Sequence, residues 1–344
     1  MSATISEIAR RAGVTDGTVS RVLNSLHEPK YRSAVRRAEK IRRIAAQMGY
    51  RPHAAARVTR QGRFQAVGLL ASLDRRRRYM PVELLEAVHD ALAEHDLQLT
   101  YAKVPDAKLT DAGFVPRLLR EWSVDGLLIN YSHGFPAAMV ELIDRFRIPS
   151  VWMNTRRATD AVYPDDRAAA EEATRYLLAS GRARIAYLAL QRPGSEEHYS
   201  TAERAEGYRG AMAAAGRPAL VTQIPVREWA NGSGLIADDR LDVLRRWLSG
   251  PDRPDAVVTY SGWTAEPLVF AATAAGLRLP DDLRIVSLGG VAMSSPLGLP
   301  LTQVVSDVAQ LGRAAVAMLN RKLASPAFPL PAEPIAGRLA LGST

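Results

Sequence analysis

The sequence predicts an α/β protein in which a small three-helix domain precedes a larger body built from two doubly wound parallel sheets. The chain has 344 residues, which is too long for one ordinary hydrophobic core. Apolar residues recur at helical spacing through the first fifty residues, and from Phe64 onward apolar strand segments alternate with amphipathic helices. The excess positive charge is confined to the small domain at the amino end.

Residues 1–63 contain 14 Lys and Arg but only 4 Asp and Glu, a net charge of +10 in a chain whose total is +9. The rest of the chain is therefore close to neutral. A basic module joined to a neutral body is typical of proteins that bind a polyanion. The alternative is a solvated basic surface without a partner.

The composition excludes several kinds of site. The chain has no cysteine, which excludes disulfides, a thiolate nucleophile and a zinc site made with cysteine ligands. The start of the chain lacks the apolar core of a signal peptide, and no segment reaches the roughly 18 apolar residues of a membrane helix. We therefore expect a cytoplasmic protein. No cofactor, metal or enzymatic activity is expected, because the six histidines are scattered and no catalytic motif is present.

The first two helices are predicted to form a helix-turn-helix. Thr4 and Glu7 have the spacing of a capping box, which predicts a helix from Ile5. Gly13 follows this helix and tolerates the left-handed conformation that ends one. Thr15 is expected to cap the second helix. Two short helices joined by a turn with glycine are typical of this DNA-binding motif.

A third helix is predicted from Ala34 to Met48, with Ser33 as its cap. Its outer face is basic, and its inner face carries the apolar residues. Pro52 ends the helical region, because proline cannot continue a helix.

Three segments carry a resemblance to a known family. Residues 12–15 (Ala-Gly-Val-Thr) and 18–24 (Thr-Val-Ser-Arg-Val-Leu-Asn) resemble the headpiece of the lactose-repressor (LacI/GalR) family, and residues 49–52 (Gly-Tyr-Arg-Pro) recur where its third helix ends. The resemblance implies a DNA-binding headpiece at 1–50, a hinge at 51–63 and a bilobed periplasmic-binding-protein-like domain at 64–344 that binds an effector and dimerises. Its first lobe would span 64–156 and 305–335, and its second 157–304 and 336–344.

The second helix is expected to enter the major groove, where its first residues meet the base edges. Arg21 is expected to pair with guanine through two hydrogen bonds. Asp16 either accepts a hydrogen bond from a cytosine amino group or, as we favour, stabilises the start of the helix. Gly17 has no side chain to read a base and is expected to leave room at the groove. Since this pair of positions helps the family to choose its operator, an atypical operator is expected. The other expected DNA contacts, mostly polar side chains suited to phosphates, are Thr4, Thr15, Thr18, Ser20, Asn24, Tyr50 and Ala56.

Residues 53–60 are expected to be the hinge helix, which in this family enters the minor groove, where a leucine separates a central base step. In register, that leucine is Thr59 here. Threonine is shorter and polar, and hence a poorer wedge. Arg57 and Arg60 can still enter a narrow minor groove. We therefore predict a smaller operator kink than is usual in the family.

From Phe64 the alternation of elements argues for parallel sheets with helices on both faces and a ligand cleft at the carboxyl ends of the strands. The expected strands are 66–70, 97–102, 126–130, 150–153, 185–190, 256–259 and 285–288. The expected helices are 82–94, 137–146, 166–180, 202–215 and 238–249.

Several residues near these strand ends match effector-binding positions of the family. Arg204 belongs to an Arg-x-x-Gly-aromatic segment whose arginine contacts the effector, and Trp229 matches a ring that stacks on sugars. Asp165 matches an aspartate that opens a helix, although capping that helix is the simpler interpretation. The full set that the resemblance implies is Pro81, Asn154, Arg204, Trp229, Ser261, Gly289 and Ser306.

Two departures from the family bear on the effector. Ser261-Gly262 stands where the family has Asn-Asp, and Gly289-Gly290 stands where it has an Asp pair. Without those groups, the effector is expected to be larger, less polar or anionic, or effector binding is lost. The four arginines at 75–78 are either a solvated loop or help to hold an acidic effector.

The combined prediction is a DNA-binding transcription regulator, a repressor whose operator affinity depends on a small-molecule effector such as a sugar or glycoside. A homodimer on a palindromic operator is expected, because one half-site discriminates poorly and the chain ends where the family's core ends. The alternatives are a ligand-independent regulator and a solute-binding protein of the same body fold.

Overall fold

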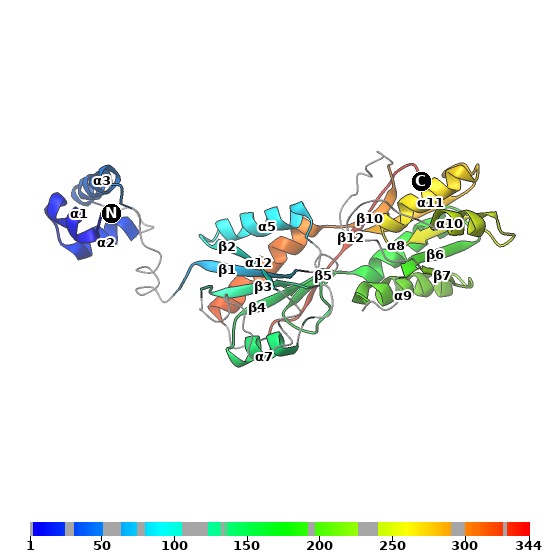
Figure 1. Ribbon diagram of the computed structural model, residues 1–344, viewed down its shortest axis with the longest axis horizontal. Coiled ribbons are helices and arrows are strands. Elements are labelled where there is room, and N and C mark those ends of the chain that lie inside the picture. The colour runs from blue at the N-terminus through cyan, green and yellow to red at the C-terminus, as the bar shows by residue number, and fades with distance from the viewer. Residues whose placement is uncertain are drawn as a thin grey trace. The chain divides into compact units, whose positions relative to one another are not determined.

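The computed structural model describes residues 3–24, 31–50, 63–73, 80–104, 123–131, 135, 137–191, 197–225, 240–289, 300–325 and 329–344. The chain divides into two compact units, Met1–Phe64 and Gln65–Thr344 (Figure 1). No helix in the described ranges is long and apolar enough to cross a membrane.

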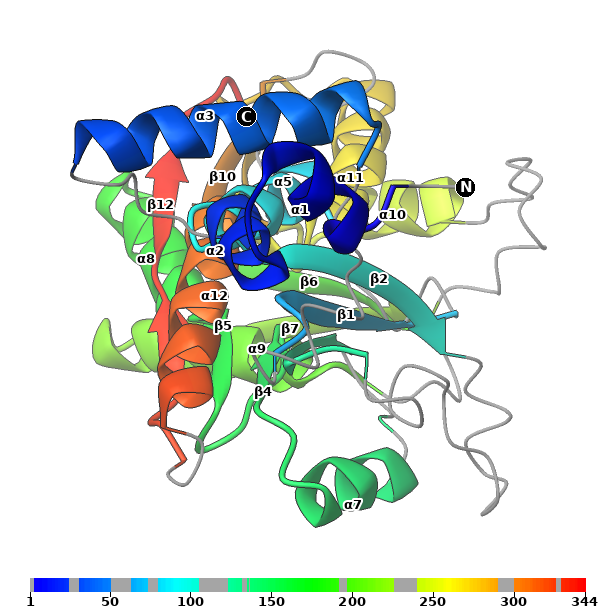
Figure 2. The same ribbon diagram turned by 90° about the vertical axis from the view of Figure 1, so that its left-hand side faces the viewer.

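The first unit contains three helices, drawn in blue in Figure 2: α1 (Ile5–Ala12), α2 (Asp16–Asn24) and α3 (Arg32–Gln47). α1 begins at the predicted capping box of Thr4 and Glu7, and Gly13 ends it with a φ of 74°. Lys40 of α3 donates to the carbonyl of Ala12 at 3.0 Å, which ties α3 to the end of α1. The three helices share a core of Ile8, Ala9, Ala12, Val19, Ile41, Ile44 and Ala45.

α3 differs from its prediction at the amino end. It begins at Arg32, two residues earlier than expected, and Tyr31 rather than Ser33 occupies the capping position. The side chain of Tyr31 makes no capping hydrogen bond. The helix is stabilised by packing of its apolar face on the other two helices, so a capping residue does not decide where it starts.

The second unit begins with a six-stranded parallel sheet whose strand order is β11-β5-β4-β3-β1-β2. Its strands are β1 (Ala66–Ser72), β2 (Gln98–Val104), β3 (Gly126–Asn130), β4 (Ser150–Met153), β5 (Ala161–Pro164) and β11 (Glu333–Ile335). Helices α5 (Val82–Ala93) and α12 (Val308–Ala324) cover one face, and α7 (Ala137–Arg145) covers the other (Figure 1).

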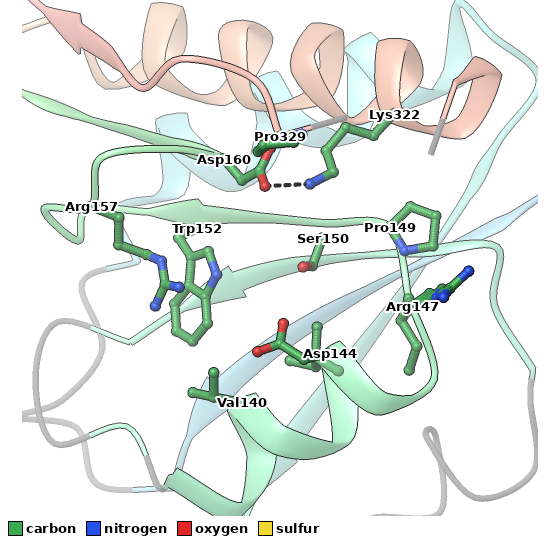
Figure 3. Close-up of a pocket in the computed structure, with 12 residues that line it drawn as sticks. Val140, Asp144, Arg147, Pro149, Ser150, Trp152, Arg157, Asp160, Lys322 and Pro329 are labelled. Atoms are coloured by element: carbon green, nitrogen blue, oxygen red, sulfur yellow. Dashed lines mark ion pairs between the residues drawn. The ribbon is translucent and has the colours of Figure 1, made fainter. Parts of the chain in front are cut away.

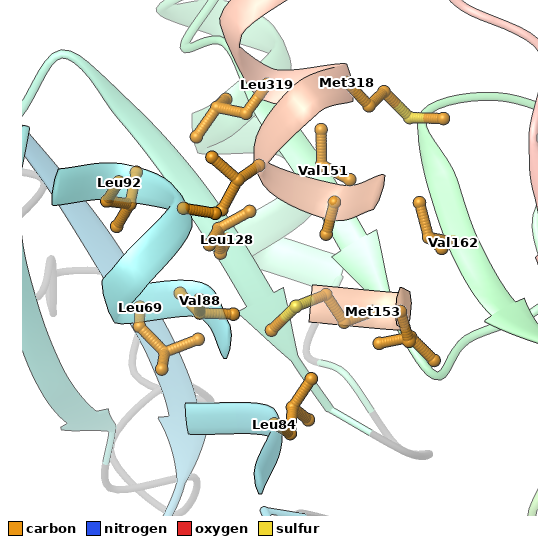
Figure 4. Close-up of a cluster of buried hydrophobic side chains, with 14 of the residues drawn as sticks. Leu69, Leu84, Val88, Leu92, Leu128, Val151, Met153, Val162, Met318 and Leu319 are labelled. Carbon is orange, nitrogen blue, oxygen red and sulfur yellow. The ribbon is translucent and has the colours of Figure 1, made fainter. Parts of the chain in front are cut away.

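The core between this sheet and its two covering helices is apolar throughout (Figure 4). Leu84 and Val88 of α5 and Leu319 of α12 pack on Leu69 and Leu128 of the sheet, and all five side chains are almost completely buried. Burial of the apolar surface of these side chains is the main favourable contribution to the stability of this lobe.

The second sheet has the order β12-β10-β9-β8-β6-β7 and is parallel except for β12, which runs antiparallel to β10. Its strands are β6 (Ile185–Gln191), β7 (Leu220–Pro225), β8 (Ala256–Thr259), β9 (Arg284–Gly289), β10 (Thr302–Ser306) and β12 (Gly337–Ala340). Helices α8 (Asp166–Ala179) and α9 (Tyr199–Ala214) pack on one face, and α10 (Arg240–Ser249) and α11 (Gly262–Ala274) on the other. Two parallel-dominated sheets with helices on both faces confirm the predicted fold class.

The chain first crosses between the two sheets later than expected. The first crossing was expected near residue 156, but β5 pairs with β4 and β11 of the first sheet, so the chain crosses only at Asp165. The return was expected at about residue 305, and β10 belongs to the second sheet up to Ser306, close to that position. β5 is four residues long and pairs with strand residues far away in the chain, such as Glu333. Such pairing leaves no local signal in the sequence.

Candidate nucleic-acid interface and ligand site

The start of α2 is held by side chains of its own first turn and of α1. The Thr15 hydroxyl accepts from the amide of Thr18 at 3.4 Å, so the predicted cap is confirmed. Asp16 Oδ2 accepts from the Ser6 hydroxyl at 2.6 Å, which joins α2 to α1. This bond gives Asp16 a partner within the headpiece and favours its interpretation as a residue that stabilises the helix start.

Arg21 and Gly17 lie one turn apart on α2, and both are exposed. Arg21 has no hydrogen-bond or ion-pair partner among the described residues. A Cβ placed on Gly17 would meet nothing within 4 Å, so packing within the protein does not require a glycine there. This face of α2 therefore offers an exposed guanidinium beside open backbone, which is a surface that can approach base edges.

The other expected DNA contacts fall into three groups. Thr4 and Thr15 are exposed and Thr18 is half-buried, so these hydroxyls lie at the surface. Ser20, in contrast, is only 5% exposed and faces the interior, and Tyr50 packs partly against the headpiece core. The side chain of Asn24 and the hinge residues Ala56, Arg57, Thr59 and Arg60 lie outside the described residues.

The expected effector residues lie at the carboxyl ends of strands, as the parallel sheets require. Asn154 follows β4 of the first sheet, and Pro81 precedes α5. Ser261 follows β8, Gly289 ends β9 and Ser306 ends β10, and these three strands are neighbours in the second sheet. Trp229 and the four arginines at 75–78 lie outside the described residues.

Arg204, in the second turn of α9, is held by protein groups. Its Nε and Nη2 each lie 2.6 Å from Asp166 Oδ1, and Nη1 donates to the carbonyl of Tyr260. The guanidinium also stacks on the Tyr260 ring, 4.7 Å from its centroid. The side chains of Arg204 and Asp166 are only 11% and 3% exposed. Burial alone would lower the pKa of Arg204, but the Asp166 carboxylate outweighs it and the pKa is raised.

The glycine and the aromatic residue of the same segment have structural roles. A Cβ on Gly207 would lie 2.2 Å from the carbonyl oxygen of Arg167, so only glycine allows α9 to approach α8 this closely. Tyr208 is buried, and its hydroxyl donates to the carbonyl of Ile185 in β6 at 2.7 Å. These contacts fix α9 against α8 and the sheet, and thereby bring Arg204 to Asp166.

A chain of hydrogen bonds joins the carboxyl edges of the two sheets. His198 Nε2 lies 3.0 Å from the carbonyl oxygen of Asn154, and His198 Nδ1 lies 2.7 Å from the Ser200 hydroxyl. That hydroxyl lies 2.8 Å from the hydroxyl of Tyr260. A carbonyl can only accept, so Nε2 carries the proton, Nδ1 accepts from Ser200, and Ser200 accepts from Tyr260. Donation therefore runs from Tyr260 in the second lobe to Asn154 in the first.

Sequence reasoning finds Arg204 and Asn154 but not the residues that connect them. Its expected effector residues include neither residues 198–200 nor Tyr260. It also favours Asp165 over Asp166. Asp165 accepts from the amide of Ala168 at 3.0 Å and caps α8, as the simpler interpretation expects. The sequence did carry a signal for Asp166. Two aspartates stand side by side at the start of α8, and because only one of them can cap the helix, the other is available for a different partner.

Two family models match the chain. The model of the bacterial regulatory proteins of the lacI family matches residues 4–53, and that of the periplasmic binding protein-like domain matches residues 174–344. The HTH-type transcriptional repressor PurR of Photobacterium profundum is 24% identical over 325 residues, which cover 93% of this chain and 92% of that protein. The ribose operon repressor of Escherichia coli is 26% identical over 328 residues, which cover 94% of each.

The fold is also similar to that of solved structures. A crystal structure of the Lac repressor dimer bound to operator and the anti-inducer ONPF matches with a TM-score of 0.77 at 20% identity, covering 100% of this chain and 99% of that one. The headpiece and the bilobed body thus occur here in the same order and over the same length. The chain thus carries the helix-turn-helix domain of the lacI family of bacterial regulatory proteins, followed by a periplasmic binding protein-like domain.

Proposed function

We propose that this protein is a repressor that binds a palindromic operator as a homodimer and changes its operator affinity when a small-molecule effector binds at the carboxyl edges of its two sheets. The observation that carries the proposal is the exposed Arg21 on α2, which has no partner among the described residues and lies one turn from the open backbone at Gly17. It lies in a segment whose net charge is +10. The family supports the same interpretation, since its model describes regulatory proteins.

In this proposal Arg21 reads a guanine, while Thr4, Thr15 and Thr18 contact phosphates and position α2 without selecting a sequence. Asp16 stabilises the start of α2 through Ser6. The hinge carries Thr59 in place of the family's leucine, so the operator is kinked less than is usual.

The effector is a sugar or a related metabolite. Two of the similar proteins point this way by their names and titles, the ribose operon repressor and the Lac repressor with its anti-inducer ONPF. Arg204 is committed to Asp166 and Tyr260 and acts by positioning the site. The groups that contact the effector are then Asn154, Ser261 and the residues at the carboxyl ends of β9 and β10.

Exposed apolar side chains on the body support a homodimer. Trp263 and Phe270 lie seven residues apart on α11 and are 61% and 57% exposed, and Val82 on α5 is 65% exposed. Large apolar side chains at a surface favour burial against a partner. A second copy of the chain would bury them and would place a second headpiece on the other half-site. A repressor of this family acts on the chromosome, and its place is the bacterial cytoplasm.

The proposal is tested by selecting bound sequences from random double-stranded DNA with the full-length protein. A palindrome is expected, and its affinity should fall steeply with salt, because bound Lys and Arg release counterions. Selection of no preferred sequence, or an affinity that does not change with salt, contradicts DNA recognition. A thermal-shift screen of sugars, glycosides and organic acids then identifies the effector. A stabilising compound that leaves operator affinity unchanged contradicts the regulatory part.

A further inference from the structure

A pocket of about 480 Å³ lies at the amino end of β4, between α7 and the last turn of α12 (Figure 3). This volume falls in the range of small-molecule sites. Its polar walls come from Ser150 of β4, Asp144 of α7, Lys322 of α12, and Arg157 in the loop before β5. Trp152 of β4 forms part of its apolar wall.

The pocket is distinct from the effector site proposed above. Ser150 begins β4, whereas Asn154 follows the end of the same strand. A strand rises by about 3.3 Å per residue, so the two positions are separated by roughly 13 Å along the sheet. Arg204, Ser261 and the other residues of the second lobe do not line the pocket. A ligand here would therefore leave the effector site free.

Ser150 is the first indication that the pocket is made for a ligand. The residue is only 6% exposed, and its hydroxyl has no hydrogen-bond partner among the described residues. Figure 3 shows this hydroxyl facing the space enclosed by Asp144, Trp152 and the residues of the opposite wall. The oxygen itself is not fully buried, so it is open to the pocket and can form a hydrogen bond with a polar atom of a bound molecule.

Arg157 supplies a positive charge that is held in position. Its guanidinium stacks on Trp152, 4.5 Å from the ring centroid, and Trp152 is only 3% exposed and contacts Phe135 in an edge arrangement. Neither Arg157 nor Arg147 has an ion pair among the described residues. Stacking orders the guanidinium before binding, so less entropy is lost when it binds an anion.

The remaining charges define what else the ligand carries. Lys322 and Asp160 neutralise each other through a contact of 2.6 Å, and both side chains are largely buried. This leaves Arg157 and Arg147, which have no ion pair among the described residues, and the carboxylate of Asp144, a net positive charge. Arg157, beside Trp152, can take one anionic group, while Asp144 and the Ser150 hydroxyl can accept from hydroxyl groups.

We propose that this pocket is an accessory site for a small hydroxylated organic anion, that is, a sugar acid or a sugar phosphate. The anionic group pairs with Arg157, and the hydroxyl groups bond to Ser150 and Asp144. The proposal goes beyond the proposed function, because it adds a second ligand site in the first lobe.

The test measures binding of D-gluconate and D-glucose 6-phosphate to the full-length protein by isothermal titration calorimetry. D-Glucose and inorganic phosphate are the controls, and each has only one half of the required chemistry. We expect one of the two anionic probes to bind at millimolar concentration or tighter and both controls to bind more weakly. Whichever of the two probes binds more tightly shows whether the site prefers a carboxylate or a phosphate as the anionic group.

Two variants locate the binding. Ser150→Ala removes a hydroxyl that bonds to no described protein group, so thermal stability is retained while the affinity falls about fivefold. Arg157→Gln is expected to weaken binding about tenfold or more. Arg145→Gln is the matched control, because Arg145 stacks on Phe146 in the same way but does not line the pocket.

Ser261→Ala is the control for the effector site and is expected to leave gluconate or glucose 6-phosphate binding unchanged. The proposal is overturned if neither anion binds, or if the better probe loses affinity in Ser261→Ala but not in Ser150→Ala. Equal loss in Arg157→Gln and Arg145→Gln overturns it too, because binding would then reflect net charge alone.

Discussion

The headpiece and the carboxyl edges of the body use an arginine in opposite ways. Arg21 of α2 is exposed and has no partner among the described residues, so its charge is available to a ligand outside the protein. Arg204 of α9 is buried and bonded to Asp166 and Tyr260, so its charge is used within the protein. In our proposal the same residue type, matched to the same family by the same kind of motif, therefore contacts a ligand in one place and positions other groups in the other.

This difference shows that a sequence motif predicts where a residue lies in the fold more reliably than it predicts which group the side chain of that residue will contact. In the headpiece, each capping or turn residue interacts with residues only a few positions away in the chain. The sequence motif therefore already contains both partners of each contact. In the body, Arg204 meets Asp166 across a helix pair and Tyr260 across the sheet. Its partners are separated from it by dozens of residues.

The largest expected effect is on stability and comes from Arg204→Ala. The variant leaves the Asp166 carboxylate buried without its partner, which costs about 3–5 kcal/mol. We expect a clearly lower melting temperature by calorimetry. The control is Arg209→Ala on the exposed side of the same helix, which should change little. An Arg204→Ala protein as stable as the wild type but unable to bind effector would assign Arg204 a contact role and remove the contrast.

The second prediction concerns Arg21→Ala. Loss of a bidentate contact to a guanine should weaken operator binding by about 1–3 kcal/mol, or roughly five- to more than a hundredfold, while the melting temperature stays unchanged. Fluorescence anisotropy with the selected operator measures the affinity. Arg10→Ala, an exposed arginine of α1, is the control. If Arg21→Ala weakens all sequences equally, Arg21 contacts a phosphate and not a base.

A smaller effect is expected for Gly17→Ala. Alanine has the higher helix propensity, and a Cβ at this position meets nothing within 4 Å. The headpiece should therefore gain about 0.5–1 kcal/mol of stability. The operator preference should change at the same time, because the new methyl group lies on the surface that we propose to approach DNA. Unchanged sequence selection would show that position 17 does not face the bases.

The smallest predicted effect is a pH dependence at the start of α1. Hydrogen bonds from the backbone and side chain of Thr4 lower the pKa of Glu7 below its ordinary value of 4.5. The group thus contributes stability that is fully present above pH 4.5 and is lost as the pH falls through its lower folded value. Amide exchange of the first helix should speed up on acidification. Glu7→Gln should reduce this dependence, whereas Glu39→Gln on α3 should not.

The two regions also differ in how far the sequence predicted them. α1 begins and ends where the capping box and Gly13 predict, α2 begins where Thr15 predicts, and β1, β3, β4 and β8 begin at the expected residues. In contrast, β5, α11 and α12 were not anticipated, although α12 supplies much of the first core. β5 is short and forms its pairs with distant strands. The helix start at Arg32 was missed because packing outweighs a capping residue there.

The sequence by itself determined the headpiece, the alternation of strands and helices, and the positions at strand ends where a ligand site belongs, because these depend on residues close together in the chain. Only the tertiary structure decided that Asp166 holds Arg204, that Tyr260, Ser200 and His198 connect Arg204 to Asn154, and that Ser150 and Arg157 share a pocket with Lys322. These contacts join segments tens to more than a hundred residues apart. Side-chain partners of that kind are chosen by packing and charge in the folded protein, and local patterns carry no record of them.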